Sequence, residues 1–575
     1  MDKKTLPLII LLVAIILFYY PILEFLGLYT PTEPVPQSDQ TQVVTDSIAA
    51  TQAGRQAQEQ TPQPLAETGE LVPILSQSTD LDTIGVDTIV ISTNKYSVLL
   101  TSYGGGPISM KLLEHHYRNG EPIEMMPEAD LAGPDAVFAG GTFSSATLHY
   151  GCNLTPGQYD ATHDTLEVVY AFVSPDGGVM RKRYHFYPDA YHYGFALEVE
   201  DREKLGFERQ YALIWNTPLG TTEQQLDKDY GAMQAVAMQS GSREALDDFE
   251  GDTLNQSLEG YTTWVGVRSL YFTAIMIPQG RQADLALGYG SKRQISTPDG
   301  NVEQKRITAG LVMPFAGVSG FVDSFTVYVG PMDYMLMWDY DVDLEAMLDV
   351  GTAPFFGMIL RPFAIAIMYL LPKLYDVIPN YGLVIILFAL IVKIITLPLS
   401  MKQFKSMQAM KDLAPQIEAL KKKHKKDAQA LQRETMKMYK THGVNPMSGC
   451  LVMLPQMPLM IAMFRVFQAT ILLRAAPFVG FVDDLSRGAS GFTDPYIILV
   501  IFMVITQFIS SKLTMASSQQ QQKALMYIFP LMMGFLLYSL PSGLILYWTV
   551  FSLMSLLDWF LFKRNKLKNV EVQTS

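Results

Sequence analysis

The chain has 575 residues, 49% of them apolar, and its mean hydropathy is +0.15. Such a composition is typical of a membrane protein that carries a large soluble part. The only cysteines are Cys152 and Cys450, which excludes a scaffold stapled by several disulfides, so the soluble part must be stabilised by its own apolar core.

Charge divides the chain into two halves. Residues 31–350 contain 18 Lys and Arg against 44 Asp and Glu, a net charge of −26, whereas residues 351–575 contain 23 against 10, a net charge of +13. This asymmetry indicates that the two halves face two compartments, with the basic loops of the second half in the cytoplasm.

The N-terminal segment predicts a membrane anchor. Residues 6–28 are apolar over about 20 residues, long enough to span a bilayer, and end in aromatic residues rather than a small-residue cleavage site. We therefore predict an uncleaved transmembrane anchor at 1–29, with its N-terminus in the cytoplasm. Residues 30–82 are rich in Pro, Gln, Thr and Ser, which predicts a disordered linker.

Residues 83–350 predict a β-sandwich domain with a closing helix near 333–348. Short β-rich runs separated by turn signals recur at 88–92, 96–100, 166–172, 195–199, 271–277 and 325–329. The histidines lack metal-ligand spacing, and the chain contains neither a phosphate-binding Gly-x-x-x-x-Gly-Lys-Ser/Thr motif nor a Gly-x-Ser-x-Gly motif. We therefore expect no enzymatic activity, no metal and no cofactor.

Residues 351–568 predict a helical membrane core, followed by a short cytoplasmic tail at 569–575. The expected elements are an interfacial helix at 354–374, spans at 381–400, 451–473, 494–511, 524–538 and 544–562, and a cytoplasmic helical hairpin at 401–446. With the anchor, this gives six spans and two cytoplasmic termini. Reading 354–374 as a further span is the alternative, but it would place the lysine-rich hairpin outside.

Lys393 interrupts the first of these core spans. It lies about 12 residues, or roughly 18 Å, past Tyr381 in a helix, and a cation at that depth costs about 3 kcal/mol. Such a residue should face a watery cavity or a partner rather than lipid. A side chain that stretches to the nearer headgroups is the alternative.

The hairpin at 401–446 contains 11 Lys and Arg against 4 Asp and Glu, which marks it as cytoplasmic. Its apolar residues recur every three or four positions on both sides of a lysine run, which predicts two antiparallel helices. The run consists of Lys421, Lys422, Lys423, Lys425 and Lys426. It is either a solvated turn or a contact with the ribosome, with anionic lipid or with a targeting factor.

The span at 451–473 carries two prolines and two polar residues. Pro455 and Pro458 free backbone groups that water or neighbouring helices must satisfy, and Gln456 between them could face the same cavity as Lys393. Arg465 either reaches the outer interface or is a second cation in that cavity.

Several motifs in this half resemble one family. They are Asn380-Tyr-Gly with a basic residue at 393 and Pro398-Leu, the lysine-rich hairpin, Asn445-Pro-Met-Ser-Gly-Cys450, Pro455-Gln-Met-Pro458, Leu473-Arg-Ala-Ala-Pro-Phe478, Asp494-Pro-Tyr and Pro541-Ser-Gly-Leu-Ile-Leu-Tyr547. Their order and spacing resemble the bacterial YidC-type membrane protein insertases, relatives of the mitochondrial and thylakoid oxidase-assembly insertases. The anchor and exported domain resemble the Gram-negative form, through Tyr103-Gly-Gly-Gly-Pro107 and Val329-Gly-Pro-Met-Asp-Tyr334.

The resemblance implies a five-helix insertase core with a hydrophilic groove, and a periplasmic domain with a β-supersandwich, galactose-mutarotase-like fold. It implies that Lys393 supplies the groove charge, that Gln456 lines the groove, and that Tyr547 and Trp548 contact the substrate helix. Arg465 would be a possible second groove charge. Two residues depart from the family pattern, because Lys393 stands where arginine is usual and Trp548 where tyrosine is frequent.

The function implied is insertion, folding and assembly of inner-membrane proteins, alone or with the Sec translocon. The expected partners are nascent membrane proteins, the Sec translocon, the ribosome through the hairpin and tail, and anionic lipid, without sequence-specific binding of nucleic acid. A small-anion transporter using Lys393 and Arg465 is the alternative, but it predicts internal repeats of the spans, and the sequence has none. A sugar-modifying enzyme would need convergent acid and base residues, which the sequence also lacks.

Overall fold

A computed structural model describes residues 87–127, 129–138, 143–205, 210–298, 300–315, 319–350, 357–424, 427–443, 453–514 and 520–574. The predicted anchor at 1–29 and linker at 30–82 lie outside these residues, as does the Asn445–Cys450 motif.

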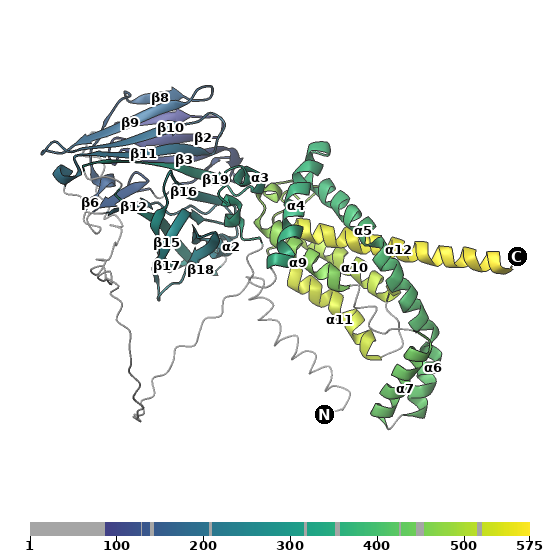
Figure 1. Ribbon diagram of the computed structural model, residues 1–575. Coiled ribbons are helices and arrows are strands. Elements are labelled where there is room, and N and C mark those ends of the chain that lie inside the picture. The colour runs from purple at the N-terminus through teal and green to yellow at the C-terminus, as the bar shows by residue number, and fades with distance from the viewer. Residues whose placement is uncertain are drawn as a thin grey trace, which may run out of the picture. The chain divides into compact units, whose positions relative to one another are not determined.

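The first part of the described chain is built from strands (Figure 1). These are β1 Thr88–Ser92, β2 Tyr96–Thr101, β3 Gly106–His116, β4 Pro122–Glu124, β5 Asp135–Phe138, β6 Phe143–Ser144, β7 Gly151–Cys152, β8 Gly157–Asp160, β9 Leu166–Val173, β10 Val179–Phe186, β11 His192–Glu200, β12 Gln210–Trp215, β13 Gln234–Gln239, β14 Ser242–Leu246, β15 Thr253–Arg268, β16 Phe272–Gln279, β17 Ala283–Thr297, β18 Gly300–Pro314 and β19 Phe321–Pro331. A short helix, α2 Leu226–Ala232, follows β12.

The strands form two sheets. Within the described residues the smaller sheet has the order β4-β3-β2-β1-β8, in which β8 runs parallel to β1. The larger sheet follows the path β6-β5-β12-β18-β17-β15-β16-β19-β11-β10-β9-β7, and β13 and β14 extend it beside β15. One apolar core contains residues of both sheets, so the predicted β-sandwich is confirmed.

Strand β10 shows how the sequence directs side chains into this core. Its residues alternate between half-buried and buried, which places Met180, Lys182, Tyr184 and Phe186 on the inner face. Lys182 is fully buried, and its ammonium donates a hydrogen bond to the carbonyl of Gly104 at 2.8 Å. The aromatic residues of this strand are therefore core residues.

The predicted closing helix at 333–348 is wrong as a single helix. The segment contains α3 Tyr334–Trp338 and the 3-10 helix η5 Leu344–Leu348. Between them Asp341 and Asp343 adopt left-handed backbone conformations with φ of 55° and 53°, which an α-helix cannot continue. Aspartate tolerates this conformation better than most residues, so the run of aspartates ends the helix.

The second part of the described chain is helical (Figure 1). Its elements are α4 Gly357–Val377, α5 Tyr381–Asp412, α6 Ala414–Lys423, α7 Ala428–Thr441, α9 Met453–Ala469, the 3-10 helix η6 Ile471–Leu473, α10 Ile497–Thr514, α11 Gln520–Leu537 and α12 Ser542–Thr574. Helix α12 packs against both α5 and α10, α10 packs against α11, and α4 packs against α9.

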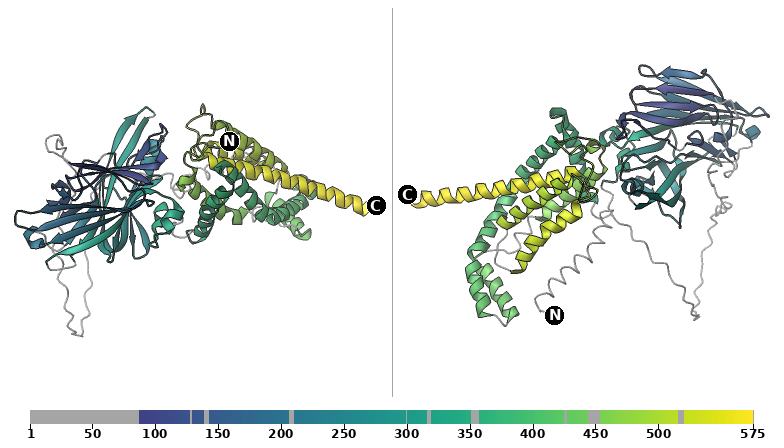
Figure 2. Two further views of the ribbon diagram at one scale, coloured as in Figure 1. Left: turned by 90° about the horizontal axis from the view of Figure 1, so that it is seen from above. Right: turned by 180° about the vertical axis from the view of Figure 1, so that it is seen from behind.

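Helix α5 continues well beyond the predicted end of its span at 400. It reaches Asp412, because residues 399–412 contain neither proline nor glycine, and the next break comes at Leu413, before Pro415 in the first turn of α6. Helices α6 and α7 lie side by side beyond α5 (Figures 1 and 2), and Leu413, Ile417 and Tyr439 form a small core there. The first arm of the predicted hairpin is thus shared between α5 and α6.

The helical part exposes apolar side chains and buries polar ones. On α10 the exposed large residues recur every three or four positions, at Ile498, Ile501, Phe502, Ile505 and Ile509. The buried polar residues include Thr506, Ser510 and Ser511 of α10 and Thr549 and Ser552 of α12. An apolar exterior around a polar interior is the arrangement that lipid favours.

Two described helices are long and apolar enough to cross a bilayer, over Tyr381–Met401 in α5 and Ser542–Trp559 in α12. Shorter apolar stretches occur at Ile497–Leu513 in α10 and Tyr527–Leu537 in α11.

Candidate functional site

Lys393 and Asp558 form an ion pair between the two long apolar helices. Lys393 Nζ of α5 lies 2.9 Å from Asp558 Oδ2 of α12, and the two side chains are only 8% and 9% exposed. Each charge would be costly to bury alone, and together they compensate one another. The sequence predicts that Lys393 faces a watery cavity, a partner or the nearer headgroups. In the structure it faces a partner within the protein, Asp558.

The Lys393 ammonium meets three groups on one face of α12. Besides Asp558, it donates a hydrogen bond to Ser555 Oγ at 2.9 Å and lies 4.7 Å from the centre of the Phe551 ring. Positions 551, 555 and 558 are four and three residues apart, so their side chains follow one another along the same helix face. Helix α12 therefore presents an acceptor, an aromatic face and a carboxylate to one lysine.

The carboxylate of this pair is only partly satisfied. Asp558 Oδ2 accepts no hydrogen bond from the residues that the structure describes, although it is buried and close to Lys393. The contact is thus an electrostatic one without hydrogen-bond geometry. A buried carboxylate oxygen without a donor is unusual, because such groups are normally hydrogen-bonded.

Gln456 and Tyr547 lie together at a second polar position. Tyr547 of α12 is fully buried between Phe388 and Phe551, with ring centroids 6.0 and 5.8 Å away, and the Gln456 amide of α9 lies near its hydroxyl. Within the described part of the chain, neither Gln456 Nε2 nor the Tyr547 hydroxyl has a hydrogen-bond partner. Through Phe551, these residues are continuous with the Lys393 pair.

Trp548 lies on a different side of α12 from Tyr547. Its indole Nε1 donates to Gln507 Oε1 of α10 at 3.3 Å, and Ser552 Oγ donates to the same oxygen at 2.8 Å. Consecutive helical residues point about 100° apart, so these two aromatic residues do not share one face. The structure brings Lys393, Gln456 and Tyr547 into one region and directs Trp548 toward α10.

Sequence reasoning missed Asp558. It is the only acidic residue of the predicted span at 544–562, and an ionisable residue in an apolar span indicates function by default, as it does for Lys393. Thr549, Ser552, Ser555 and Asp558 recur every third position, which is a polar stripe that the sequence already contains.

The other predicted site residues differ in their burial. Arg465 is half-buried on α9. On α6, Lys421 is half-buried, and Lys422 and Lys423 are exposed. Lys425 and Lys426 lie outside the described residues.

The opposite end of α5 is fitted closely to the loop after η6. Asn380 Nδ2 donates to the carbonyl of Pro477 at 3.4 Å, and a Cβ at Gly382 would overlap the ring of Phe478. Two of the motifs that carried the family resemblance therefore meet here. A glycine at 382 is required by this close approach.

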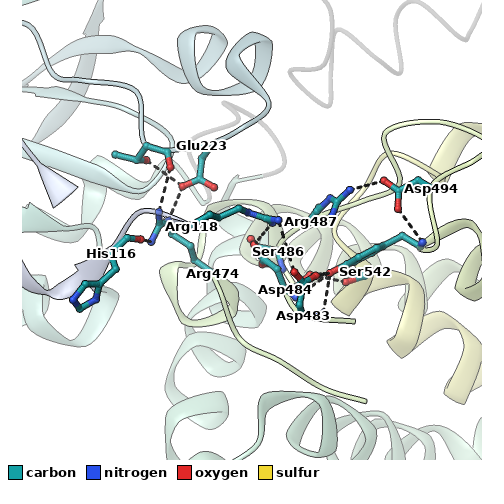
Figure 3. Close-up of polar contacts among 12 residues, drawn as sticks. His116, Arg118, Glu223, Arg474, Asp483, Asp484, Ser486, Arg487, Asp494 and Ser542 are labelled. Carbon is teal, nitrogen blue, oxygen red and sulfur yellow. Dashed lines mark hydrogen bonds and ion pairs between the residues drawn. The ribbon is translucent and has the colours of Figure 1, made fainter. Parts of the chain in front are cut away.

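The same loop is tied to α10 and α12 by polar contacts of Asp484 and Asp494 (Figure 3). Asp484 accepts hydrogen bonds from the amide and hydroxyl of Ser486 at 2.9 and 2.6 Å, and its carbonyl accepts one from Ser542 Oγ at 3.1 Å. Asp494 pairs with Arg487 at 2.6 Å just before α10. These contacts hold the beginnings of α10 and α12 together.

Arg474 and Arg118 join this loop to the β-sandwich (Figure 3). Arg474 Nε lies 2.6 Å from Glu223 Oε1, and its guanidinium also donates to the carbonyl of His116 at 3.1 Å. Arg118 Nη2 lies 3.0 Å from Asp484 Oδ2. Burial raises the pKa of Glu223, and the neighbouring Arg474 opposes that rise.

Comparison with known families agrees with this architecture. The model of the YidC periplasmic domain matches residues 88–366, and the model of the 60Kd inner membrane protein matches residues 373–569. Together the two models cover the sandwich and the helical part.

Similar proteins are named membrane protein insertase YidC. That of Chlorobium luteolum is 32% identical over 488 residues, covering 82% of this chain and 81% of the relative, and that of Syntrophus aciditrophicus is 27% identical over 565 residues, covering 97% and 98%. Among solved structures, an active YidC insertase is 19% identical with a TM-score of 0.35, covering 81% of this chain and 91% of that one, and the YidC of Thermotoga maritima is 13% identical with a TM-score of 0.27, covering 82% and 98%. At 32% identity over about four fifths of both chains, this protein belongs to the YidC family of inner-membrane protein insertases.

Proposed function

We propose that this protein inserts other membrane proteins into the inner membrane through the polar region between α5, α9, α10 and α12. The observation that carries the proposal is the buried pair of Lys393 and Asp558 between helices whose outer surfaces are apolar. Soluble proteins rarely place apolar side chains outside and charges inside, whereas a protein that handles polar segments within lipid needs this arrangement.

The physical task of such a region is to lower one barrier. A client helix gains about 25 cal/mol for each Å² of apolar surface that leaves water, so its own insertion is favourable. Its polar outer segment must cross hydrocarbon and loses hydration on the way. Polar groups such as Lys393, Gln456 and Ser555 shorten the low-dielectric path, so that no nucleotide hydrolysis and no other enzymatic step is required.

We also propose the topology that the charge pattern predicts. The predicted anchor, α5, α9, α10, α11 and α12 would be six spans with both termini in the cytoplasm, α4 would lie at the outer interface, and the sandwich would be periplasmic with a β-supersandwich form. The apolar length of α5 and α12 supports the two spans that carry the pair. Lys422 and Lys423, exposed on α6, support a cytoplasmic hairpin.

Specific roles follow from the positions of the residues. Lys393 would supply the charge that a client meets, Gln456 and Tyr547 would line the path beside it, and Trp548 would act through its contact with α10. The lysines of α6 would contact the ribosome or anionic lipid. Action with the Sec translocon would extend the range of clients.

The transporter alternative is disfavoured by the sequence, because a small-anion transporter predicts internal repeats of the spans and the sequence has none.

A reconstitution experiment tests the proposed function. Vesicles containing the full-length protein receive a newly synthesised client that has one apolar helix and a short polar outer segment, and protease protection of that segment measures insertion. We expect severalfold more protection than in protein-free vesicles of the same lipid. Equal protection in both would contradict the proposal.

A further inference from the structure

We propose that Asp558 is an internal counter-ion that competes with acidic residues of a client for Lys393 and so determines client specificity. The inference rests on the proposed function and adds a residue that regulates it. In the resting protein Asp558 occupies the position that a client carboxylate would take beside the Lys393 ammonium.

The geometry indicates that the pair can exchange. Lys393 donates its hydrogen bond to Ser555, while the Asp558 oxygen at 2.9 Å accepts none from the described residues. An ammonium has three donors, so it retains capacity for an incoming carboxylate. A pair held by charge without a hydrogen bond is easier to separate than one that is fully hydrogen-bonded.

The energetics favour exchange over simple dissociation. Separating the pair would leave two uncompensated buried charges, each of which is strongly unfavourable. When a client carboxylate arrives as Asp558 leaves, Lys393 keeps a partner throughout. Asp558 therefore sets a threshold, because a client acid gains only the difference between its own contact and the contact that it replaces.

The arrangement of α12 explains how the resting state is restored. Phe551, Ser555 and Asp558 contact the ammonium from one face of one helix, so the two smaller contacts hold Lys393 close to Asp558 during an exchange. When the client moves into lipid, Asp558 pairs with Lys393 again. This keeps the region neutral overall and allows clients without an acidic residue to pass.

A purely structural role for the pair makes a different prediction. If Asp558 only joins α12 to α5, its loss should reduce insertion of all clients by the same factor. Competition predicts instead a change in the ratio between an acidic client and its neutral twin. The ratio does not depend on how much active protein is present, so it separates the two roles.

The experiment uses the full-length protein in vesicles at matched amounts, and two clients that differ only by Asp or Asn in the outer segment. The variants are Asp558→Asn, Asp558→Glu, the neutral double variant Lys393→Gln with Asp558→Asn, and the control Asp376→Asn. Asp376 is 68% exposed on α4 and lies 3.8 Å from Lys373, so the control makes the same chemical change outside the polar region.

We expect the ratio of acidic to neutral insertion to be above one in the wild type and at least about threefold higher with Asp558→Asn, because the freed lysine attracts the client acid at low effective dielectric. Asp558→Glu and Asp376→Asn should keep the wild-type ratio, and the double variant should show a ratio of one. A ratio with Asp558→Asn equal to that of the wild type would overturn the inference.

If Asp558→Asn does not accumulate, the double variant keeps the inference falsifiable, because it buries no unpaired charge and tests whether the ratio depends on Lys393. A double variant with the wild-type ratio would also overturn the inference. Both of these outcomes concern only the role of Asp558. If the wild type still inserts both clients, the proposed function stands. Failure of the wild type to exceed protein-free vesicles would instead contradict the proposed function.

Discussion

Arg474 Nε of the loop after η6 lies 2.6 Å from Glu223 Oε1 of the β-sandwich, and the two side chains are 7% and 15% exposed. The two residues are 251 positions apart in the chain, and their contact joins the helical part to the sandwich. Because burial of charge is costly unless the charge is paired, the two residues depend on one another.

Glu223→Ala should destabilise the sandwich by about 3 kcal/mol, since it leaves the Arg474 guanidinium buried without its carboxylate. The double variant Glu223→Ala with Arg474→Ala should recover part of that loss. The measurement is the thermal unfolding midpoint of the purified full-length protein. Glu259→Ala, at an exposed position of β15, is the control and should change stability by less than about 0.5 kcal/mol. A destabilisation no larger than that of the control would show that the pair is not holding the loop.

His115 should make stability depend on pH. Burial, assisted by the charge of Arg474, lowers the pKa of His115 to about 4, whereas an unfolded histidine titrates near 6.5. Between these values the unfolded chain binds the proton and the folded protein does not, so stability is lost as the pH falls from about 6.5 toward 4.

The unfolding midpoint should therefore fall between pH 7 and pH 5 by about 2–4 °C more in the wild type than in His115→Gln. Glu114, His116 and Lys95 also act on His115, and they remain unchanged in that variant. Identical pH dependence in the two proteins would mean that His115 titrates as an ordinary exposed histidine.

Labelling of single cysteines should establish the topology. In a background without Cys152 and Cys450, a cysteine at Asp164 of the sandwich should react with a membrane-impermeant reagent added outside intact cells whose outer membrane has been permeabilised. A cysteine at Gln429 on α7 should react only after the inner membrane is opened. Both positions are exposed. External labelling at position 429 would refute the six-span arrangement.

The sequence was most informative where a pattern is local. The β-rich runs at 166–172 and 195–199 predict strands, and the structure has β9 and β11 there. Lys393 could also be recognised from the sequence as a site residue, because few side chains are less compatible with lipid. Residues 399–412, in contrast, continue α5 because helix-breaking residues are absent, and the prediction of a boundary at 400 relied on polarity instead.

Contacts between distant residues could not be predicted in the same way. Asp558 follows Lys393 by 165 positions, and nothing in a single sequence indicates that α5 and α12 pack together with these residues in register. Helix geometry alone separates Tyr547 from Trp548, but their partners, Phe388 for Tyr547 and Gln507 for Trp548, depend on how α5 and α10 pack against α12. Such details follow from packing, which the sequence determines only through the complete fold.

The central claim is that Lys393 acts on the client during insertion. Measuring insertion by Lys393 variants tests this claim most directly. A short-tailed client with an acidic outer segment is added to vesicles containing equal amounts of the wild type, Lys393→Ala, Lys393→Arg or Lys393→Glu, and protease protection is measured. Lys373→Ala, at a position 57% exposed on α4, is the control.

We expect Lys393→Ala to reduce insertion about tenfold, Lys393→Arg to restore it because the charge returns, and Lys393→Glu to be the worst because it places a second carboxylate beside Asp558. Lys393→Glu should also lower the amount of protein that accumulates, because two carboxylates then face one another. Combining it with Asp558→Lys should restore that amount, because the ion pair returns with its charges exchanged. Equal insertion of the client by the wild type and by the alanine, arginine and glutamate variants would contradict the claim that Lys393 acts on the client.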